Sequence, residues 1–213
     1  PYLKKGFEHL DPETLWEYNA KDVSYTYQLH ELFQERLDAN NRQVLRTLLY
    51  PASDVLARME SLGVLVDVPT LDRLDQQYTA EIDTLIKQLH TTAGREFNPN
   101  SDKQLLQLLY TDLELPIPGR LSTDKAALTE IREFHPIVDM LLQYRAKKKL
   151  HSTYVVALKE AADVNGRVHT TFNLHGTVTG RLSSSNPVNL QNIPRNSDIR
   201  RIFVATPGYT LVE

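Results

Sequence analysis

The sequence contains no cysteine among its 213 residues, which excludes disulfide bonds and thiolate metal sites. This absence fits a reducing compartment, and we expect the protein in the cytoplasm. No apolar run approaches the roughly 18 residues of a membrane-spanning helix, so we expect no membrane partner. The 41% of hydrophobic residues suffice for the core of one large or two small domains.

Acidic residues are scarce in one part of the chain. Residues 145–201 contain 10 Lys and Arg but only 3 Asp and Glu, whereas residues 1–144 contain 14 and 23. The net charge of −3 therefore hides a basic segment. Such segregation is typical of a surface that binds phosphates. A solvated helix face would explain the lysines at 147–149, but not the loss of acids over the whole segment.

Helical patterns dominate the first 162 residues. Asp11 followed by Pro12 is a good N-cap and first-turn pair, and it predicts a helix near the N-terminus. Pro51 is expected to open or kink another helix that stops at Gly63. Apolar residues three or four apart predict a long amphipathic helix from about 69 to 92.

The following stretch predicts shorter helices. Ser101 with Gln104 forms a capping-box pattern. Ser122 and Thr123 can cap a helix over 124–134.

Strand patterns are few, and most lie late in the chain. Pro136 precedes a long helix to about 162, after which the β-branched and aromatic run 168–172 predicts a strand. A short strand is also expected over 64–66. We therefore expect a mainly α fold with a smaller α+β part.

The polar loop 179–195 is the most informative segment. It places Arg181 after the turn-forming Gly180 and contains several carboxamides, among them Asn189, Gln191 and Asn192. Arg, Asn and Gln carry donors for the purine N3 and pyrimidine O2 acceptors that every base pair presents in the minor groove. The loop therefore predicts sequence-independent contact with a duplex. The alternative is a polar loop whose amides cap strand ends.

Tyr18 and Asp22 are the candidate catalytic pair, because residues four apart share one face of a helix. In a two-metal phosphodiester hydrolysis a carboxylate such as Asp22 holds a metal ion and a tyrosine hydroxyl orients the attacking water. The same spacing is common on solvated helices. Asp22 alone cannot hold two metal ions, so we expect no such hydrolysis from this chain alone.

Three ordered motifs, at 179–184, 189–194 and 199–203, resemble the family A DNA polymerases, the bacterial DNA polymerase I type. In that family this stretch opens the palm. Val188 departs from the family pattern, which runs from the proline straight into Asn-Leu-Gln, and Arg195 directly after Pro194 also departs. Both alter the local length of the loop.

The resemblance covers nearly the whole chain and implies three parts. Residues 1–42 are the C-terminal end of a 3′–5′ exonuclease-like domain, whose third motif Tyr18 and Asp22 resemble. Residues 43–165 form a thumb with two long antiparallel helices and a small helical tip. Residues 166–213 begin the palm with its first strands.

The resemblance also implies that the thumb grips a primer–template duplex. The candidate contacts are Asn98, Ser101 and Lys103 near the tip and Ser152 and Thr153 near the palm. Phosphate contacts of this kind position a duplex without specifying its sequence. Ser101 can instead serve only as a helix cap.

Arg181 is expected to reach the minor-groove edge at the primer terminus, with Asn189, Gln191 and Asn192 as support. Arg200 is expected to hold a backbone phosphate or brace the palm. A mismatch would displace the base acceptors and cost roughly 1–3 kcal/mol per lost contact.

Nucleotidyl transfer needs two carboxylates that hold two Mg²⁺ ions between the primer hydroxyl and the deoxynucleoside triphosphate. In the family the first follows the strand that begins near Tyr209, and this chain ends at Glu213. We therefore expect part of a polymerase, either a fragment or one subunit of a split enzyme. A complementary polypeptide would then carry the rest of the palm and the fingers.

Two other functions share most of these features. A non-catalytic duplex-DNA-binding or scaffolding subunit would share all of these features, but it would not depend on the rest of a palm. An RNA-binding helical protein is disfavoured because base-reading RNA modules rely on aromatic stacking, and aromatic residues make up only 8% of this chain. Within the family, the Tyr-x3-Asp motif favours a proofreading enzyme, and the irregular loop favours a phage source.

Overall fold

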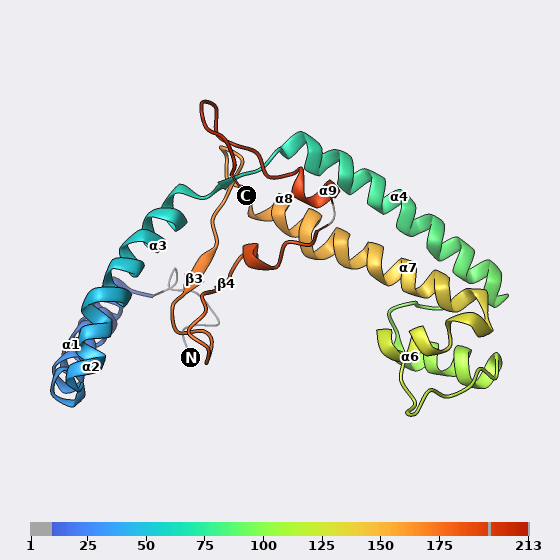
Figure 1. Ribbon diagram of the computed structural model, residues 1–213, viewed down its shortest axis with the longest axis horizontal. Helices are drawn as coiled ribbons and strands as arrows, with labels where there is room; N and C mark the ends of the chain where they lie inside the picture. Colours follow the sequence, from blue (N-terminus) through green and yellow to red (C-terminus); the bar gives the residue numbers. More distant parts are fainter. Residues whose placement is uncertain (1–9, 196, 213) are drawn as a thin grey trace. The chain divides into compact units, whose positions relative to one another are not determined.

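The computed structural model describes residues 10–195 and 197–212 and shows a mainly helical chain with two small antiparallel sheets among them (Figure 1). The predicted fold class, mainly α with a smaller α+β part, is confirmed. The chain forms two compact units, Pro1–Val55 and Leu56–Glu213. The functional division at residues 42 and 165 stays a prediction. No helix among the described residues combines the length and hydropathy needed to cross a membrane.

Helix α1, Pro12–Arg36, begins as predicted: the backbone N–H of Thr14 donates to Asp11 Oδ1 at 2.9 Å, and proline occupies the first turn. None of its residues is buried. Trp16 is 69% exposed and Tyr27 is 64% exposed, so within the described part of its unit α1 has no core to cover.

The next helices form one continuous run in which Pro51 lies near the middle. They are α2 (Ala39–Val44), the π-turn η2 (Leu45–Leu49) and α3 (Tyr50–Leu62). Proline has no N–H and clashes with the carbonyl four residues earlier, so the wider π-turn before Pro51 relieves that conflict. Pro51 therefore interrupts a helix and does not open one.

Gly63 ends α3 as predicted, with a left-handed φ of +65°. The chain then enters β1 (Val64–Leu65), which pairs antiparallel with β2 (Arg167–Val168). A Cβ atom at Gly63 would lie 2.8 Å from His169 Cε1 and 3.1 Å from the Val168 carbonyl oxygen. Glycine is required here both by φ and by the close approach of β2.

The single strand predicted over 168–172 is wrong in its extent. β2 ends at Val168, and β3 (Thr171–Asn173) pairs with β4 (Ser183–Ser185) in the other sheet. The two residues between β2 and β3 hydrogen-bond elsewhere: His169 to the Glu60 carbonyl and Thr170 to Ser185 and Val188. The sheet partner therefore changes within a run that looks uniform in sequence.

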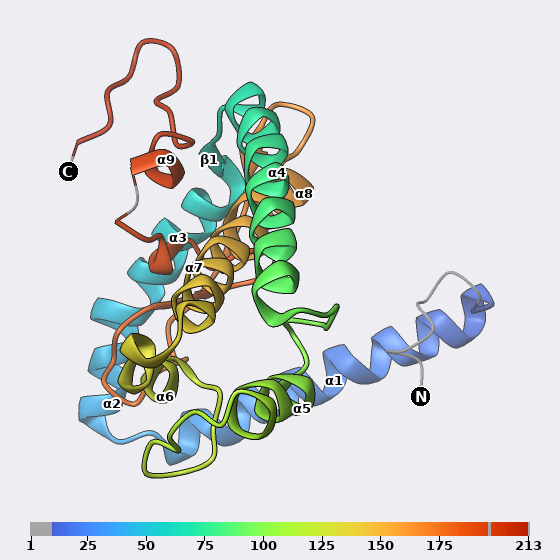
Figure 2. The same ribbon diagram turned by 90° about the vertical axis from the view of Figure 1, so that its right-hand side faces the viewer.

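Two long antiparallel helices lie side by side in Figures 1 and 2. The first is α4 (Val68–Ala93), close to the predicted 69–92. The second runs through α7 (Pro136–Leu150), the π-turn η5 (His151–Val156) and α8 (Ala157–Ala161). Its end agrees with the predicted 162, whereas the π-turn was not predicted.

A small helical tip joins these long helices. It contains α5 (Asp102–Leu106), the π-turn η3 (Gln107–Asp112), α6 (Lys125–Glu130) and the 3₁₀ turn η4 (Arg132–Phe134). Ser101 caps α5 by accepting from the backbone N–H of Gln104 at 3.4 Å. The reciprocal half of the capping box differs from the prediction, because Gln104 Oε1 accepts from the backbone N–H of Asn98 at 2.7 Å.

The helix predicted over 124–134 is shorter than expected and has a different cap. Asp124 accepts from the backbone N–H of Ala127 at 2.9 Å, and α6 ends at Glu130. Ser122 supports this cap indirectly, because its Oγ accepts from the backbone N–H of Asp124 at 3.1 Å. A carboxylate at the N-terminus of a helix also interacts favourably with the helix dipole.

The long helices bury two separate cores. The tip core is built around Leu89, Phe97, Leu105, Leu108, Leu109, Leu115, Leu128, Ile131, Ile137, Val138, Leu141 and Tyr144. The base core contains Val66, Leu71, Leu74, Tyr78, Tyr154, Val155, Leu158, Val168, Val188, Ile199 and Ile202. The base core thus joins the long helices to segment 166–203, including the region around α9 (Ser197–Arg200). The two expected parts, thumb and palm start, share this core.

Polar contacts set the register of the two long helices. Lys147 Nζ lies 2.6 Å from Glu81 Oε2 and 4.3 Å from the centre of the Tyr78 ring. His151 Nε2 lies 2.7 Å from Asp75 Oδ1, and Lys159 Nζ lies 3.0 Å from Asp75 Oδ2. The hydrogen bond with His151, followed by that from Lys159, lowers the pKa of Asp75.

His169 ties the end of α3 to the turn before β2. Its Nδ1 lies 2.7 Å from the Glu60 carbonyl oxygen, and its Nε2 lies 3.4 Å from Asp163 Oδ2. Both partners are acceptors, so the doubly protonated ring satisfies both contacts. The hydrogen bond to Glu60, and then the one to Asp163, raise the pKa of His169, while nearby Arg167 opposes this.

We expect Gly63→Ala to destabilise the protein by about 1–3 kcal/mol more than Gly94→Ala, because only Gly63 has a neighbour in the way of the new methyl group. Gly94 has a similar φ of +69° with no heavy atom within 4 Å, so it reports the backbone strain alone, about 1 kcal/mol. Urea unfolding of both variants measures the difference. Equal losses would contradict the packing argument.

His169 should make stability depend on pH. Its pKa is raised in the folded protein, so its contribution is complete below the unfolded pKa of about 6.5 and is lost as pH rises through the folded value. The pKa of Asp163 is lowered, mainly by the backbone N–H of Arg167, so its contribution disappears only in acid. The measurement is urea unfolding of wild type and His169→Gln at about pH 5.5 and pH 8.5. The gap between the two proteins should shrink at the higher pH, and a constant gap would refute this.

Candidate nucleic-acid interface

Arg181 projects from a turn that its neighbours hold. Gly180 has a left-handed φ of +72°, and Thr177 Oγ1 donates to the Arg181 carbonyl at 2.7 Å. The backbone at Arg181 is thus fixed while its side chain is exposed. The predicted glycine turn is confirmed, and the backbone that carries the Arg181 side chain is restrained.

A buried chain of hydroxyl groups holds the other end of the loop. The backbone N–H of Leu190 donates to Ser184 Oγ at 3.1 Å, and Ser184 Oγ lies 2.7 Å from Thr170 Oγ1. Thr170 Oγ1 lies 2.7 Å from the carbonyl oxygens of both Ser185 and Val188. Ser184 is 4% exposed and Thr170 is 6% exposed, so water competes little for these bonds. Linked bonds in such surroundings strengthen one another.

Val188, the residue that departs from the family pattern, is an internal anchor. Its side chain is 5% exposed and belongs to the base core, while its carbonyl accepts from Thr170. The Val188 side chain therefore points inward.

The side-chain oxygen of Asn189 is engaged within the loop, so its NH₂ group remains for other partners. Asn189 Oδ1 accepts from the backbone N–H of Gln191 at 3.0 Å and so caps the 3₁₀ turn η6 (Leu190–Asn192). The side-chain NH₂ group is then what an outside acceptor can reach. Gln191 and Asn192 are also exposed, so the three carboxamides do share one short surface segment.

β4 separates these carboxamides from Arg181. The strand has three residues, Ser183–Ser185, so Arg181 and the carboxamides stand on either side of it in the sequence.

Beside the loop lies a basic groove, a cavity of about 840 Å³ that reaches from the tip to Pro194. Its cations are Lys125, Arg132, Arg145 and Lys149. Arg132 pairs with Asp139 at 2.6 Å, while Arg145 donates to the Thr123 carbonyl and lies 3.5 Å from Asp102.

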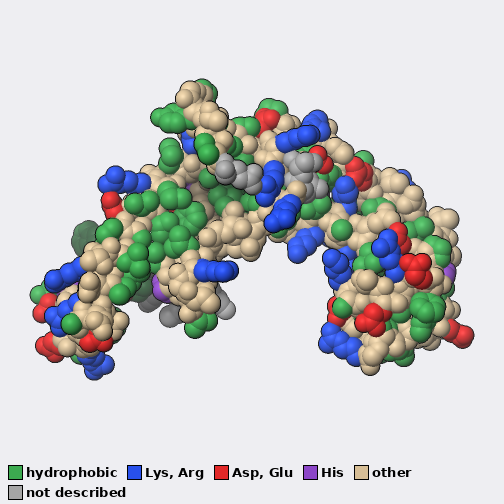
Figure 3. Space-filling view, viewed as in Figure 1, with side chains coloured by type: hydrophobic (Ala, Val, Ile, Leu, Met, Phe, Trp, Pro, Cys, Tyr) green, Lys and Arg blue, Asp and Glu red, His purple; other side chains and the backbone are tan. Residues whose placement is uncertain are grey.

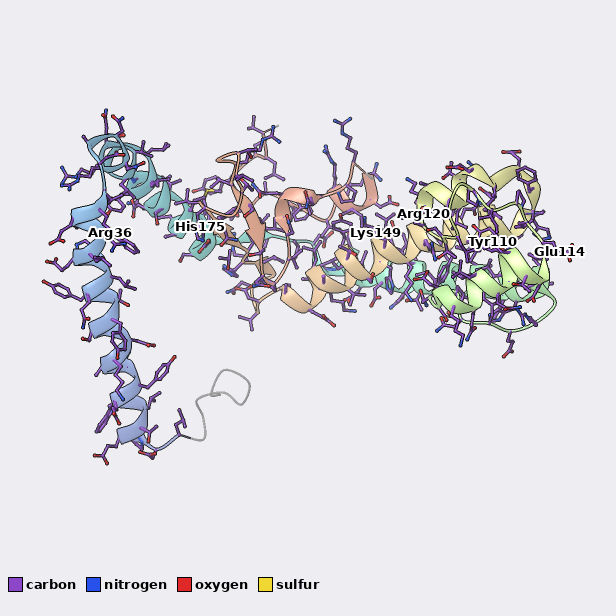
Figure 4. All side chains as sticks on the ribbon, turned by 90° about the horizontal axis from the view of Figure 1, so that it is seen from below. Arg36, Tyr110, Glu114, Arg120, Lys149 and His175 are labelled. Atoms are coloured by element: carbon purple, nitrogen blue, oxygen red, sulfur yellow. The ribbon has the colours of Figure 1, made fainter. Side chains whose placement is uncertain are left out.

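Lys149 is exposed on α7, where Figure 4 labels it. Lys and Arg side chains gather over α7 and α9 in Figure 3. This distribution is suited to a polyanion.

The other predicted contacts have mixed surroundings. Asn98 Oδ1 accepts from the backbone N–H of Asn100 at 2.9 Å, and Ser152 Oγ donates to the Lys148 carbonyl at 2.9 Å. Lys103, Thr153 and Arg200 are exposed on α5, η5 and α9. Ser101 is occupied as a helix cap. Their roles in binding stay predictions.

Tyr18 and Asp22 lie four residues apart on α1, as the sequence predicts, and Asp22 is exposed. Among the residues that the structure describes, no group of three or more His, Cys, Asp or Glu side chains could hold a metal ion. The role of Asp22 as a metal ligand stays a prediction, and no chemical step is assigned to it.

Sequence reasoning missed several residues that shape this site. Thr170 and Tyr154 act through partners far along the chain, and no local pattern marks those partners. Ser184 lies in the motif at 179–184, but its bond to Thr170 depends on the tertiary structure. Lys125 and Arg132 lie in the acidic part of the sequence, so the charge count concealed them. Lys149 was noted only as part of a solvated helix face, and not as a binding residue.

The sequence model of DNA polymerase family A matches residues 68–213. The chain belongs to this family, and the predicted resemblance is confirmed.

The chain is 39% identical to DNA polymerase I of Treponema pallidum (strain Nichols) over 216 residues, which covers 97% of this chain and 22% of the relative. It is 43% identical to the thermostable DNA polymerase I of Thermus thermophilus over 197 residues, covering 86% and 24%. It is 36% identical to the DNA polymerase of Escherichia phage T5 over 218 residues, covering 94% and 26%. The chain thus spans 22% to 26% of the length of these relatives.

A solved structure is also similar to this chain. It is described as the POL domain of Pol1 from M. smegmatis in complex with DNA primer-template and dNTP. The two share 35% sequence identity with a TM-score of 0.74, over 80% of this chain and 32% of the other.

We expect Thr170→Val to destabilise the protein by about 1–3 kcal/mol, because it removes the central hydroxyl and leaves buried polar groups without a partner. Thr171→Val is the control, since Thr171 is exposed and starts β3. Thermal and urea unfolding of both variants provide the comparison. A loss in Thr170→Val no larger than in the control would show that the hydroxyl chain contributes nothing.

Proposed function

We propose that this chain is the part of a template-directed DNA polymerase that holds the primer–template duplex. The observation that supports this best is a restrained loop with exposed amide and guanidinium side chains, next to a basic groove. The loop contacts base edges in the minor groove and the groove contacts phosphates. The similar solved structure, described in complex with DNA primer-template and dNTP, supports this assignment.

Within this function the three parts keep their expected roles. Residues 1–42 end an exonuclease-like domain, 43–165 form the thumb, and 166–213 begin the palm. Arg181 reaches the primer terminus, while Asn189, Gln191 and Asn192 contact the pairs beside it. Asn98, Lys103, Ser152, Thr153 and Arg200 are further phosphate contacts.

Nucleotidyl transfer requires groups beyond those described here. We propose that the carboxylates for Mg²⁺ and the nucleotide-binding fingers come from further palm and fingers residues, on the same polypeptide or on a complementary one. The present chain would then contribute binding, orientation and the sensing of a mismatched end. Holding reactants in the right geometry is itself a large part of catalysis.

The first test is duplex binding by fluorescence anisotropy, with labelled primer–template DNA at several salt concentrations. If the basic groove holds phosphates, Lys149→Ala should weaken binding and reduce the slope of log K against log salt by about 1. Arg95→Ala is the matched control, because Arg95 is an exposed cation of the tip that pairs with Asp112 and does not line the groove. Equal effects of the two substitutions would contradict the assignment of the groove.

Primer extension separates the polymerase from a non-catalytic duplex-binding subunit. With the palm and fingers supplied, wild type should extend a primer with Mg²⁺ and four deoxynucleotides, and Arg181→Ala should abolish extension. Salt-sensitive duplex binding without extension would instead support the non-catalytic function.

A further inference from the structure

One hydrogen bond joins the long helix to the end of the carboxamide segment. Tyr154 Oη donates to the Asn192 carbonyl at 2.8 Å, across 38 residues of sequence. The Tyr154 side chain is 9% exposed and belongs to the base core. A buried phenol hydroxyl needs a partner, and here the partner is the backbone of η6.

The π-turn η5 lies where this bond is made. η5 (His151–Val156) interrupts an otherwise regular helix. Pro51 accounts for the π-turn η2, but no proline lies in or directly after η5. An inserted residue turns the following side chains by about 100° relative to those before it. π-turns occur frequently at functional sites. The turn holds Tyr154 and Val155 in the base core while Ser152 and Thr153 stay exposed.

η6 is consequently held at both ends. Its first residue, Leu190, donates its N–H to Ser184 Oγ, and its last, Asn192, accepts from Tyr154. A segment of three residues fixed at both ends has little freedom to shift its side chains. The bond from Tyr154 is the one that comes from the long helix.

Tyr154 also touches the basic groove. It lines the cavity together with Lys149 and Pro194, so a duplex phosphate in the groove and the base-reading loop meet at this side chain. The restraint on η6 and the wall of the groove therefore depend on the same residue.

We propose that Tyr154 is a positioning residue that sets where the amides of Asn189, Gln191 and Asn192 meet the terminal base pairs, and so sets how well a mismatch is rejected. This rests on the proposed function. Preorganised donors discriminate because a misplaced acceptor leaves them unpaired, whereas a mobile loop follows the wrong pair. Tyr154 itself touches no reacting atom in this proposal.

The test compares Tyr154→Phe with Tyr110→Phe. Both substitutions remove one phenol hydroxyl from a partly or fully buried ring that donates to a loop carbonyl. Tyr110 Oη donates to the Ser122 carbonyl at 2.7 Å in the tip, where Figure 4 labels Tyr110. Tyr110→Phe therefore controls for the loss of such a bond away from the carboxamide segment.

Two readouts are measured on each variant. The first is hydrogen exchange at the Leu190 and Gln191 amides, which Ser184 Oγ and Asn189 Oδ1 protect. The second is the ratio of kcat/KM for matched over mismatched primer ends, in the polymerase with palm and fingers present. The loss of one hydrogen bond should change each by about two- to tenfold in Tyr154→Phe, and neither in Tyr110→Phe.

The outcomes distinguish failure of this positioning role from failure of the proposed polymerase function. Faster exchange together with a lower ratio, in Tyr154→Phe alone, supports the positioning role. Unchanged exchange, or faster exchange with an unchanged ratio, overturns it. If wild type does not extend primers at all, the proposed function fails, and exchange alone then decides whether Tyr154 positions η6.

Discussion

The base core is the constraint on which the rest of the described C-terminal unit depends. It buries side chains from α4, from the second long helix and from segment 166–203, so these parts fold around one another. Full burial of an aliphatic side chain such as Val188 or Ile202 contributes about 1.5–3 kcal/mol. This core also holds Tyr154, which lines the basic groove near Pro194.

The core brings the loop and the long helix together, and hydrogen bonds then fix how the loop is oriented. Apolar burial does not depend on orientation, but a buried hydroxyl must face a partner. Thr170 and Ser184 hold the loop from the sheet side, and Tyr154 holds it from the long helix. Thr170 and Tyr154 bond to backbone oxygens of the loop, and Ser184 accepts from the Leu190 N–H. The side chains of Asn189, Gln191 and Asn192 stay exposed. In the proposed function, these exposed amide groups are the donors that contact base edges.

Local patterns predicted the helices well. The periodicity of α4 and the Asp11 cap are encoded within a few residues, and both were confirmed. The strand at 168–172 was wrong because its partner changes at Thr170, which depends on segments distant in sequence. The cap at Asp124 was missed because several polar residues in succession could each have capped α6. The binding roles of the site residues stay predictions.

The sequence by itself determined the family, the helical periodicity, the glycine turn before Arg181 and the segregation of charge, since each of these is written in neighbouring residues. Only the tertiary structure decided that Val188 points inward, that Thr170 reaches Ser184 across 14 residues, and that Tyr154 reaches Asn192 across 38. The physical reason is that these contacts form between segments that meet only when the base core closes. No local preference of Tyr or Thr specifies which distant carbonyl or hydroxyl it will find.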